Sequence, residues 1–196
     1  MKVKRRSLRG MVMPKCMAFK AGGLMDFLQL ATERYSVRSF ALKPIEDEKL
    51  MQILRAGQVA PTAVNFQPQQ IYVLKSEAAL QKIRSLTRFT YQAPVVLLCC
   101  ADLTRAWKSP VEIGYNTAEM DVSIVCTHMM LEAWDLGIGS VWVRGFSAPQ
   151  VAKAFALPEH IKPICLLPIG YPSADSAPFR QWHDSYRPLS ELVEIR

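Results

Sequence analysis

Hydrophobic positions along the chain change their spacing several times, and this spacing predicts where helices and strands lie. Apolar residues at helical spacing predict five helices, over residues 25–34, 43–60, 76–86, 116–137 and 147–157. Apolar runs bounded by turn residues predict four strands, over residues 70–75, 93–102, 140–143 and 164–172. Two helices come first and strands then alternate with helices. This order predicts an α/β (α+β) domain with a mixed sheet of about four or five strands flanked by helices.

The predicted helix at residues 116–137 is apolar on two faces. One stripe consists of Met120, Ile124, Leu131 and Trp134, and the other consists of Val122, Val125, Met129, Ala133 and Leu136. A helix of this kind is buried on both sides. It is therefore expected to lie centrally in the domain or at a subunit interface.

Capping residues support several of these boundaries. Ser76 precedes the third predicted helix as an N-cap, and Gly137 ends the fourth as a C-cap. Ser147, with Gln150 three residues later, matches the capping-box pattern at the start of the fifth.

Charge is distributed unevenly along the 196 residues. Seven of the 24 lysines and arginines lie in residues 1–24, which contain no acidic residue, so the remainder carries 17 charges of each sign. A neutral body without a basic stripe argues against a nucleic-acid-binding domain. The basic segment lacks the apolar run of a secretory signal. It is expected to be a poorly ordered arm or an extension upstream of a start at Met25, which leaves residues 25–196 as a single domain.

Cysteine, histidine and hydropathy patterns narrow the class further. No apolar run is long enough to cross a membrane. The five cysteines form no C-x-x-C pair, and Cys99, Cys100 and Cys165 sit in apolar strand-like runs, as buried free thiols of a reducing cytoplasm do. The three histidines are scattered without ligand spacing, so no metal site is predicted.

Two short stretches are candidates for cofactor binding. "GIGSVWVRG" (residues 137–145) holds three glycines after a helix and before a strand, whereas a dinucleotide fingerprint follows a strand and opens a helix. "RYSVRSF" (residues 34–40) alternates Arg34, Ser36 and Arg38. In extended backbone these side chains point to one side, where arginine matches a phosphate bidentately. Taken alone, however, this stretch fits a polar helix end and loop better.

Five motifs in series favour the cofactor-binding interpretation of this stretch over a polar helix end. "RYSVRSF", "APTAVNFQP", "LGIGSVWV", "LLPIGYP" and "YRPLSELV" follow one another between Met25 and about Val193. This series resembles the FMN-dependent nitroreductase family. The resemblance implies the nitroreductase-like fold, with a mixed, mainly antiparallel sheet and a long buried central helix. It also implies an intertwined homodimer with two FMN sites at the subunit interface.

The resemblance assigns roles to the basic residues. Arg34 and Ser36 would bind the FMN phosphate, and Arg187 would lie at the same phosphate. Arg38 would lie near N1 and the C2 carbonyl of the flavin, where it acts as an electrostatic tuner. No side chain is expected to serve as a catalytic acid.

The resemblance also implies contacts between the flavin and two loops. One loop would come from the partner subunit, and the other would direct a backbone N–H at flavin N5. The residues concerned are Pro61, Thr62, Ala63, Asn65 and Gln67 in the first loop, and Val143, Arg144 and Gly145 in the second.

The series departs from the family pattern at two positions. Gln69 stands where a tryptophan is frequent, and Ser185 stands where a second basic residue is frequent. The irregular segment 102–117 would be a reduced substrate lid. Trp107 and Tyr115 would line this lid or lie on the surface.

The sequence thus predicts a cytoplasmic, FMN-dependent NAD(P)H oxidoreductase. NADH or NADPH would reduce FMN, and a nitroaromatic, quinone or similar small aromatic acceptor would take the electrons in ping-pong order. The alternatives with the same fold are flavin fragmentation, reductive dehalogenation, and flavin binding or storage without efficient turnover.

Overall fold

The structure is a computed structural model, and it describes residues 26–196 of the chain. The basic segment 1–24 and Met25 lie outside the described residues, and the expectations for an arm or an upstream start concern that segment. Among the described helices, none combines the length and the apolar character needed to cross a membrane.

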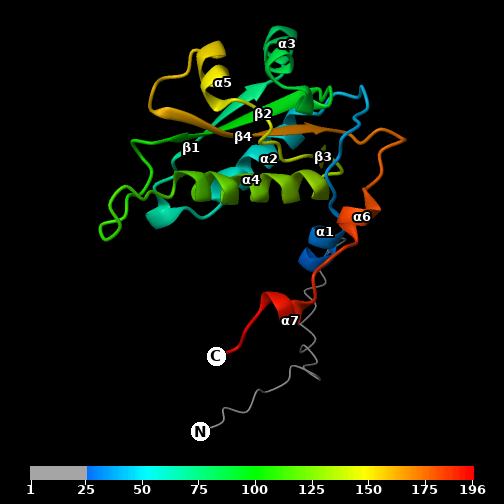
Figure 1. Cartoon of the computed structure of the whole chain (residues 1–196). Helices are drawn as coiled ribbons and strands as arrows, with labels where there is room; N and C mark the ends of the chain where they lie inside the picture. Colours follow the sequence, from blue (N-terminus) through cyan, green and yellow to red (C-terminus); the bar gives the residue numbers. More distant parts are fainter. Residues whose placement is uncertain (1–25) are drawn as a thin grey trace.

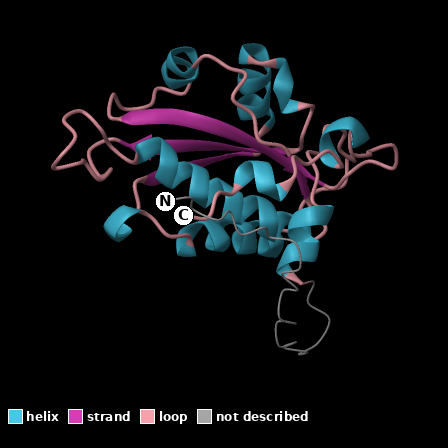
Figure 2. Ribbon diagram, turned by 60° about the horizontal axis from the view of Figure 1, so that its bottom comes forward, coloured by secondary structure: helices cyan, strands magenta, loops and turns pink. Residues whose placement is uncertain are grey.

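A four-stranded sheet forms the middle layer, and helices cover both of its faces (Figures 1 and 2). The strands are β1 (Gln69–Leu74), β2 (Val95–Asp102), β3 (Gly139–Ser140) and β4 (Ile161–Gly170). The helices are α1 (Phe27–Glu33), α2 (Asp47–Val59), α3 (Glu77–Leu86), α4 (Ala118–Asp135), α5 (Ala148–Ala154), α6 (Arg180–His183) and α7 (Leu189–Leu192), with the 3₁₀ turns η1 (Ala63–Asn65) and η2 (Arg88–Thr90). α2 and α4 lie on one face of the sheet, and α3 and α5 lie on the other (Figure 1).

Neighbouring strands run antiparallel in the order β1-β2-β4-β3. The predicted α+β class, with a mainly antiparallel sheet of four strands between helices, is therefore confirmed. Among the described residues, the parallel part of the sheet is a single bridge between Ser36 and Ser140.

β3 is shorter than the predicted strand 140–143, because it pairs with β4 only at Gly139 and Ser140. The N–H of Val141 donates to the carbonyl of Pro168 at 3.2 Å. A proline has no N–H to donate in return, so the ladder breaks at this position. The chain then meets β4 once more, in an isolated bridge at Val143.

The core is divided into two layers by β2, which is buried on both faces as its continuous apolar run predicts. Leu97 and Cys99 belong to the layer under α2 and α4. Leu98 and Cys100 belong to the layer under α3 and α5. Successive residues of a strand point to opposite faces, so each helical layer receives every second side chain.

Helix α4 has one fully buried face. Val122, Val125 and Met129 are 0% exposed. Gly57 of α2 allows a close approach here, because a Cβ at this position would lie 2.8 Å from Cγ of Met129. The stripe with Met120 is only partly covered, since Met120 is 54% exposed whereas Ile124, Leu131 and Trp134 are half-buried. Burial of this face is therefore incomplete within the single chain, and a subunit interface stays the prediction for its exposed part.

The capping predictions have different outcomes. The side chain of Ser76 accepts a hydrogen bond from the N–H of Ala79 at 3.3 Å, and Gly137 has the left-handed φ of 75° expected of a C-cap. The capping box at Ser147 is wrong, because its side chain forms no capping hydrogen bond. Pro149 in the first turn of α5 lacks one of the two N–H groups that an N-cap side chain can bind, and the Ser147 side chain does not bind the other, that of Gln150, either.

Candidate functional site

A pocket of about 310 Å³ lies beside the extended segment that follows α1. Its walls come from the end of α1, from that segment, and from α6 with the residues around it. The lining contains arginines and aromatic rings and neither aspartate nor glutamate, so the pocket is positively charged. The lining residues are Ala31, Arg34, Tyr35, Ser36, Arg38, Phe179, Trp182, His183 and Tyr186.

The structure brings Arg34, Ser36 and Arg38 to this one pocket. The intervening Val37 points the other way and is 0% exposed. Its N–H donates to the carbonyl of Ser140 at 3.0 Å, which fixes the segment against the end of the sheet. The alternation along the extended segment therefore separates a buried anchor from three polar side chains.

Close packing under Val37 depends on a glycine in β3. A Cβ at Gly139 would lie 2.5 Å from Cγ2 of Val37, a distance that no relaxed structure contains. The glycine-rich stretch that resembles a nucleotide fingerprint therefore has a different role, because it lets the arginine-bearing segment approach the sheet.

The two arginines keep their charge available in the pocket. Burial lowers the pKa of Arg34, Tyr186 opposes that shift, and a guanidinium stays protonated in either case. The Arg38 guanidinium lies 5.1 Å from the ring centroid of Phe179 and 6.0 Å from that of Trp182. Cation–π contacts of this kind hold an arginine in place without neutralising it.

The aromatic side of the pocket is tied to the helical layer through Tyr35. Its ring packs edge-on against Trp134 of α4, with centroids 5.1 Å apart. Its hydroxyl lies 3.2 Å from Oγ of Ser176, in the segment before α6. This wall was not predicted from the sequence, although the aromatic residues clustered at Phe179, Trp182 and Tyr186 in a polar segment were a usable signal.

The second group of predicted residues forms a tight loop after α2. The Thr62 hydroxyl accepts a hydrogen bond from the Gln67 N–H at 3.0 Å, and its carbonyl accepts one from the Asn65 N–H at 2.9 Å. Val64, Asn65 and Gln67 all have left-handed φ values, of 45°, 57° and 50°. Such values are unusual for a β-branched residue. Strained backbone of this kind persists only where surrounding contacts hold it, and it concentrates at functional sites.

Asp121 holds this loop, a role that was not predicted from the sequence. Its side chain is almost fully buried, at 2% exposure for the residue. Oδ1 accepts the N–H of Ala63 at 2.9 Å, and Oδ2 accepts the hydroxyl of Thr117 at 2.7 Å. An aspartate in the first turn of a helix is ordinarily explained by the helix dipole, which is why its second role was not apparent.

The pocket and the loop lie at opposite ends of α4. Asp121 is in the first turn of this helix and Trp134 is in the last. At 1.5 Å of rise per residue they are about 20 Å apart along the helix axis. Figure 1 shows α1 and α6 at the C-terminal end of α4, on the pocket side. One chain therefore contains two separate groups of predicted site residues.

The predicted turn at residues 143–145 is held against η2. Val143 exchanges two backbone hydrogen bonds of 2.9 Å with β4, and the carbonyl of Gly145 accepts the Thr87 hydroxyl at 2.7 Å. A Cβ at Gly145 would lie 2.6 Å from the Phe89 ring. The side chain of Arg144 is exposed, so its predicted contribution to the site is through the backbone.

Three further predicted residues are not among those that line the pocket. Arg187 pairs with Glu191 at 3.3 Å, and its side chain is 67% exposed. Trp107 is half-buried and Tyr115 is 38% exposed, and neither of them lines the pocket. Their roles at a phosphate or in a lid stay predictions.

The fold and the pocket define a class, namely an antiparallel α+β protein with a cationic, aromatic-walled pocket suited to an anionic ring compound. The chain belongs to the nitroreductase family, whose sequence profile matches residues 31–88 and 84–171.

Three similar proteins illustrate this relationship. A nitroreductase family protein of Clostridium difficile has a crystal structure that superposes with a TM-score of 0.80 at 37% identity, covering 87% of this chain and 98% of that one. A proposed NADH dehydrogenase/NAD(P)H nitroreductase of Archaeoglobus fulgidus is 30% identical over 170 residues, covering 83% of this chain and 94% of its own. An FMN reductase (NAD(P)H) of Bacillus subtilis is 29% identical over 170 residues, covering 78% and 68%.

Proposed function

We propose that this chain is an FMN-dependent oxidoreductase that uses NAD(P)H and works as a homodimer in the cytoplasm. Membership of the nitroreductase family supports the oxidoreductase class, and the similar FMN reductase supports the cofactor. The four described cysteines are free thiols, as is usual in a reducing compartment. The observation that carries the proposal is the single pocket that joins Arg34, Ser36 and Arg38 to an aromatic wall.

The pocket residues fit the two ends of FMN. Arg34 and Ser36 offer a cation and a hydroxyl to a phosphate. Ser140, bridged to Ser36, has a buried hydroxyl for which the described residues provide no hydrogen-bond partner, but it does not line the pocket. Phe179 and Trp182 offer flat apolar surface to a flavin ring. The volume of about 310 Å³ is at the small end of the about 300–1,000 Å³ usual for cofactor pockets, so one chain would enclose only part of FMN.

A second copy of the chain would complete the site. The loop with Asn65 and the pocket with Arg34 cannot meet within one chain, because the length of α4 separates them. A twofold axis that sets the α4 helices of two copies antiparallel would bring the loop of each chain to the pocket of the other.

The surface of the chain is consistent with such a dimer. Large apolar side chains are more than half exposed on α1, α2, α4 and α7. Extended apolar patches on a folded chain mark interaction surfaces. The residues are Phe27, Leu28, Met51, Val59, Met120, Leu189 and Leu192.

The protein residues would bind and tune the cofactor rather than carry the reaction themselves. FMN, when bound, accepts a hydride from NADH or NADPH and passes electrons to a second substrate. Arg34 and Ser36 would hold the phosphate. Arg38, kept in place by its aromatic neighbours, would present positive charge where negative charge develops on the ring. The loop with Asn65 would shield the ring from water.

The acceptor we propose is a nitroaromatic, a quinone or a similar small aromatic compound, reduced in ping-pong order. The test begins with FMN-saturated protein titrated anaerobically with NADH and then NADPH, followed by a panel of acceptors. Bleaching of the flavin band by a nicotinamide and parallel-line steady-state kinetics are the expected results. A bound flavin that neither nicotinamide reduces would instead indicate storage.

A further inference from the structure

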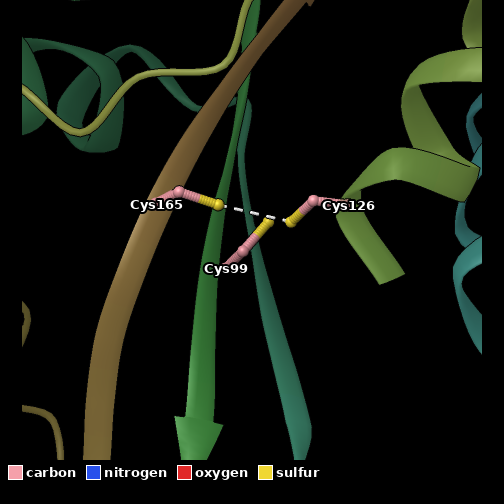
Figure 3. A group of neighbouring side chains, drawn as sticks. All are labelled: Cys99, Cys126 and Cys165. Carbon is pink, nitrogen blue, oxygen red and sulfur yellow. Dashed lines mark hydrogen bonds between the residues drawn. The ribbon is translucent and has the colours of Figure 1, made fainter. Parts of the chain in front are cut away.

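Three cysteine side chains meet in the core between the sheet and α4 (Figure 3). Cys99 comes from β2, Cys165 from β4 and Cys126 from α4, and their sulfur atoms all lie within 4.8 Å of one another. The sulfurs of Cys126 and Cys165 are 3.3 Å apart. All three are free thiols and at most 1% exposed. We call this group the thiol triad. The spacing of cysteines along the chain gave no sign of it, because its members come from three elements.

The pairing of β2 with β4 positions two members of the thiol triad. Cys99 pairs directly with Cys165 across β2 and β4, whereas Cys100 pairs with Pro163, so Ile164 is the extra residue of a bulge. Ile164 and Cys165 both belong to the core layer under α4, while Cys100 belongs to the opposite layer. The fold thus places three of the four described cysteines together and keeps the fourth on the other face.

The surroundings of the thiol triad are apolar. Its core layer consists of hydrophobic residues, and outside the triad the Cys99 thiol has a hydrogen bond to the carbonyl of Leu97, at 3.7 Å. Hydrogen bonds from its two sulfur neighbours, together with burial, raise the pKa of Cys99 well above its usual value. Hydrogen bonds from Cys165 and Cys99 lower the pKa of Cys126.

The net charge that a metal–thiolate complex would leave in the apolar core determines which ion fits the thiol triad. Thiolate ligands favour soft ions, but a charge left in an apolar interior is costly unless it is paired. Three thiolates around a monovalent ion leave two negative charges, and around a divalent ion they leave one. Zinc would also require a fourth ligand to close a tetrahedral site. A trivalent ion forms a neutral complex with three thiolates and needs no further ligand.

We propose that Cys99, Cys126 and Cys165 form a binding site for a trivalent thiophilic ion of the arsenic(III) class. Arsenous acid would form three arsenic–sulfur bonds and lose its three hydroxyl groups, which leave as water with the three thiol protons. No electron is transferred and no net charge enters the core.

The shape of the thiol triad agrees with a pyramidal ion. A planar three-coordinate ion with bonds of about 2.3 Å to sulfur would need about 4.0 Å between every pair of sulfurs. A pyramidal ion lies above the sulfur triangle and has shorter edges. The 3.3 Å between Cys126 and Cys165 is already shorter than the planar value.

Burial determines how the site would load. The triad has no exposed sulfur, so the ion would enter during folding or during a transient opening between α4 and the sheet. The three ligands meet only in the native state, so the bound ion would stabilise the fold by mass action. At a free concentration of 100 times Kd, this corresponds to a rise of about 5–10 °C in Tm for a chain of this size.

The test uses the full chain, which is unfolded, reduced with a phosphine and refolded with or without arsenite in the presence of saturating FMN. Native mass spectrometry should show one arsenic atom gained and three hydrogens lost per chain, and Tm should rise. Cys126→Ala and Cys165→Val should each lower arsenic affinity at least tenfold and abolish the Tm shift. Cys100→Ala, which removes the neighbouring thiol on the other face, should bind like the parent, as should Cys16→Ala.

Two results would overturn the proposal. One is arsenic binding that survives in both Cys126→Ala and Cys165→Val, with far-UV circular dichroism confirming that these variants are folded. The other is an unchanged mass and an unchanged Tm after refolding with arsenite, in a chain whose thiols are fully reduced.

Discussion

Replacing Asp121 by alanine separates the structural role of this residue from its effect on the cofactor. The Asp121→Ala change removes both the bond to the Ala63 N–H and the bond to the Thr117 hydroxyl. Hydrogen bonds to a charged group contribute about 1.5–3 kcal/mol each, and losing a buried carboxylate returns part of its desolvation cost. We expect a net loss of about 3 kcal/mol, which lowers Tm by about 6–12 °C in a chain of this size.

The same change should weaken FMN binding. Without Asp121 the loop with three left-handed residues is free to relax, and FMN binding would then have to reorder it. Restoring one such residue costs on the order of 1–2 kcal/mol, which corresponds to about a tenfold rise in Kd. Asp121→Asn keeps one acceptor oxygen and should lie between alanine and the parent.

The assays are thermal unfolding and titration of the apoprotein with FMN by fluorescence quenching. Asp135→Ala, an exposed aspartate at the other end of α4, is the matched control and should change stability by less than about 0.5 kcal/mol. An Asp121→Ala protein with the expected fall in Tm but an unchanged Kd for FMN would show that the loop does not belong to the site.

Three further predictions concern the pocket and the surface. Arg38→Gln should lower the two-electron potential of bound FMN by roughly 30–65 mV, the equivalent of a charge-assisted hydrogen bond of about 1.5–3 kcal/mol. Arg34→Gln should instead weaken FMN binding and leave the potential nearly unchanged. Equal potential shifts of the two variants in spectroelectrochemistry would refute this division of roles. Gly139→Ala should destabilise the chain by about 1–3 kcal/mol through overpacking against Val37, and a Tm equal to that of the parent would mean that the strand accommodates a methyl group. The hydrogen bond from Tyr171, with Lys43 and Lys49 nearby, holds the pKa of Glu46 down at about 2 against a usual 4.5. The ionised Glu46 carboxylate therefore stabilises the fold fully above pH 4.5, and this stabilisation is lost as the pH falls towards 2. Tyr171→Phe should flatten this part of the stability–pH curve in acid-unfolding measurements.

The sequence predicted those parts of the fold that depend on local pattern. The uninterrupted apolar run predicts β2, and Ser76 predicts the start of α3, because both signals act within a few residues. The strand predicted at 140–143 was too long, since Pro168 on the opposite strand interrupts the ladder. An opposing proline cannot be identified before the pairing is known.

The candidate site shows the same division. The alternation of Arg34, Ser36 and Arg38 predicted that their side chains lie on one side, because a period of two is a property of the segment itself. Asp121 and the thiol triad were missed, because their contacts join residues far apart in the chain. Such contacts carry no periodic signal, and only the packing of α4 on the loop and the sheet reveals them.

We propose a site composed of two chains, and mixed dimers test this proposal most directly. One chain carries Arg34→Gln and the other Asn65→Ala, and each homodimer should bind FMN weakly. If the pocket of one chain pairs with the loop of the other, the heterodimer contains one unaltered site and one doubly altered site. Equilibrium titration of the purified heterodimer should then show one FMN per dimer bound with the parental Kd. If instead both FMN bind weakly, with the affinities of the two parent variants, each site would lie within a single chain and the composite site would be wrong.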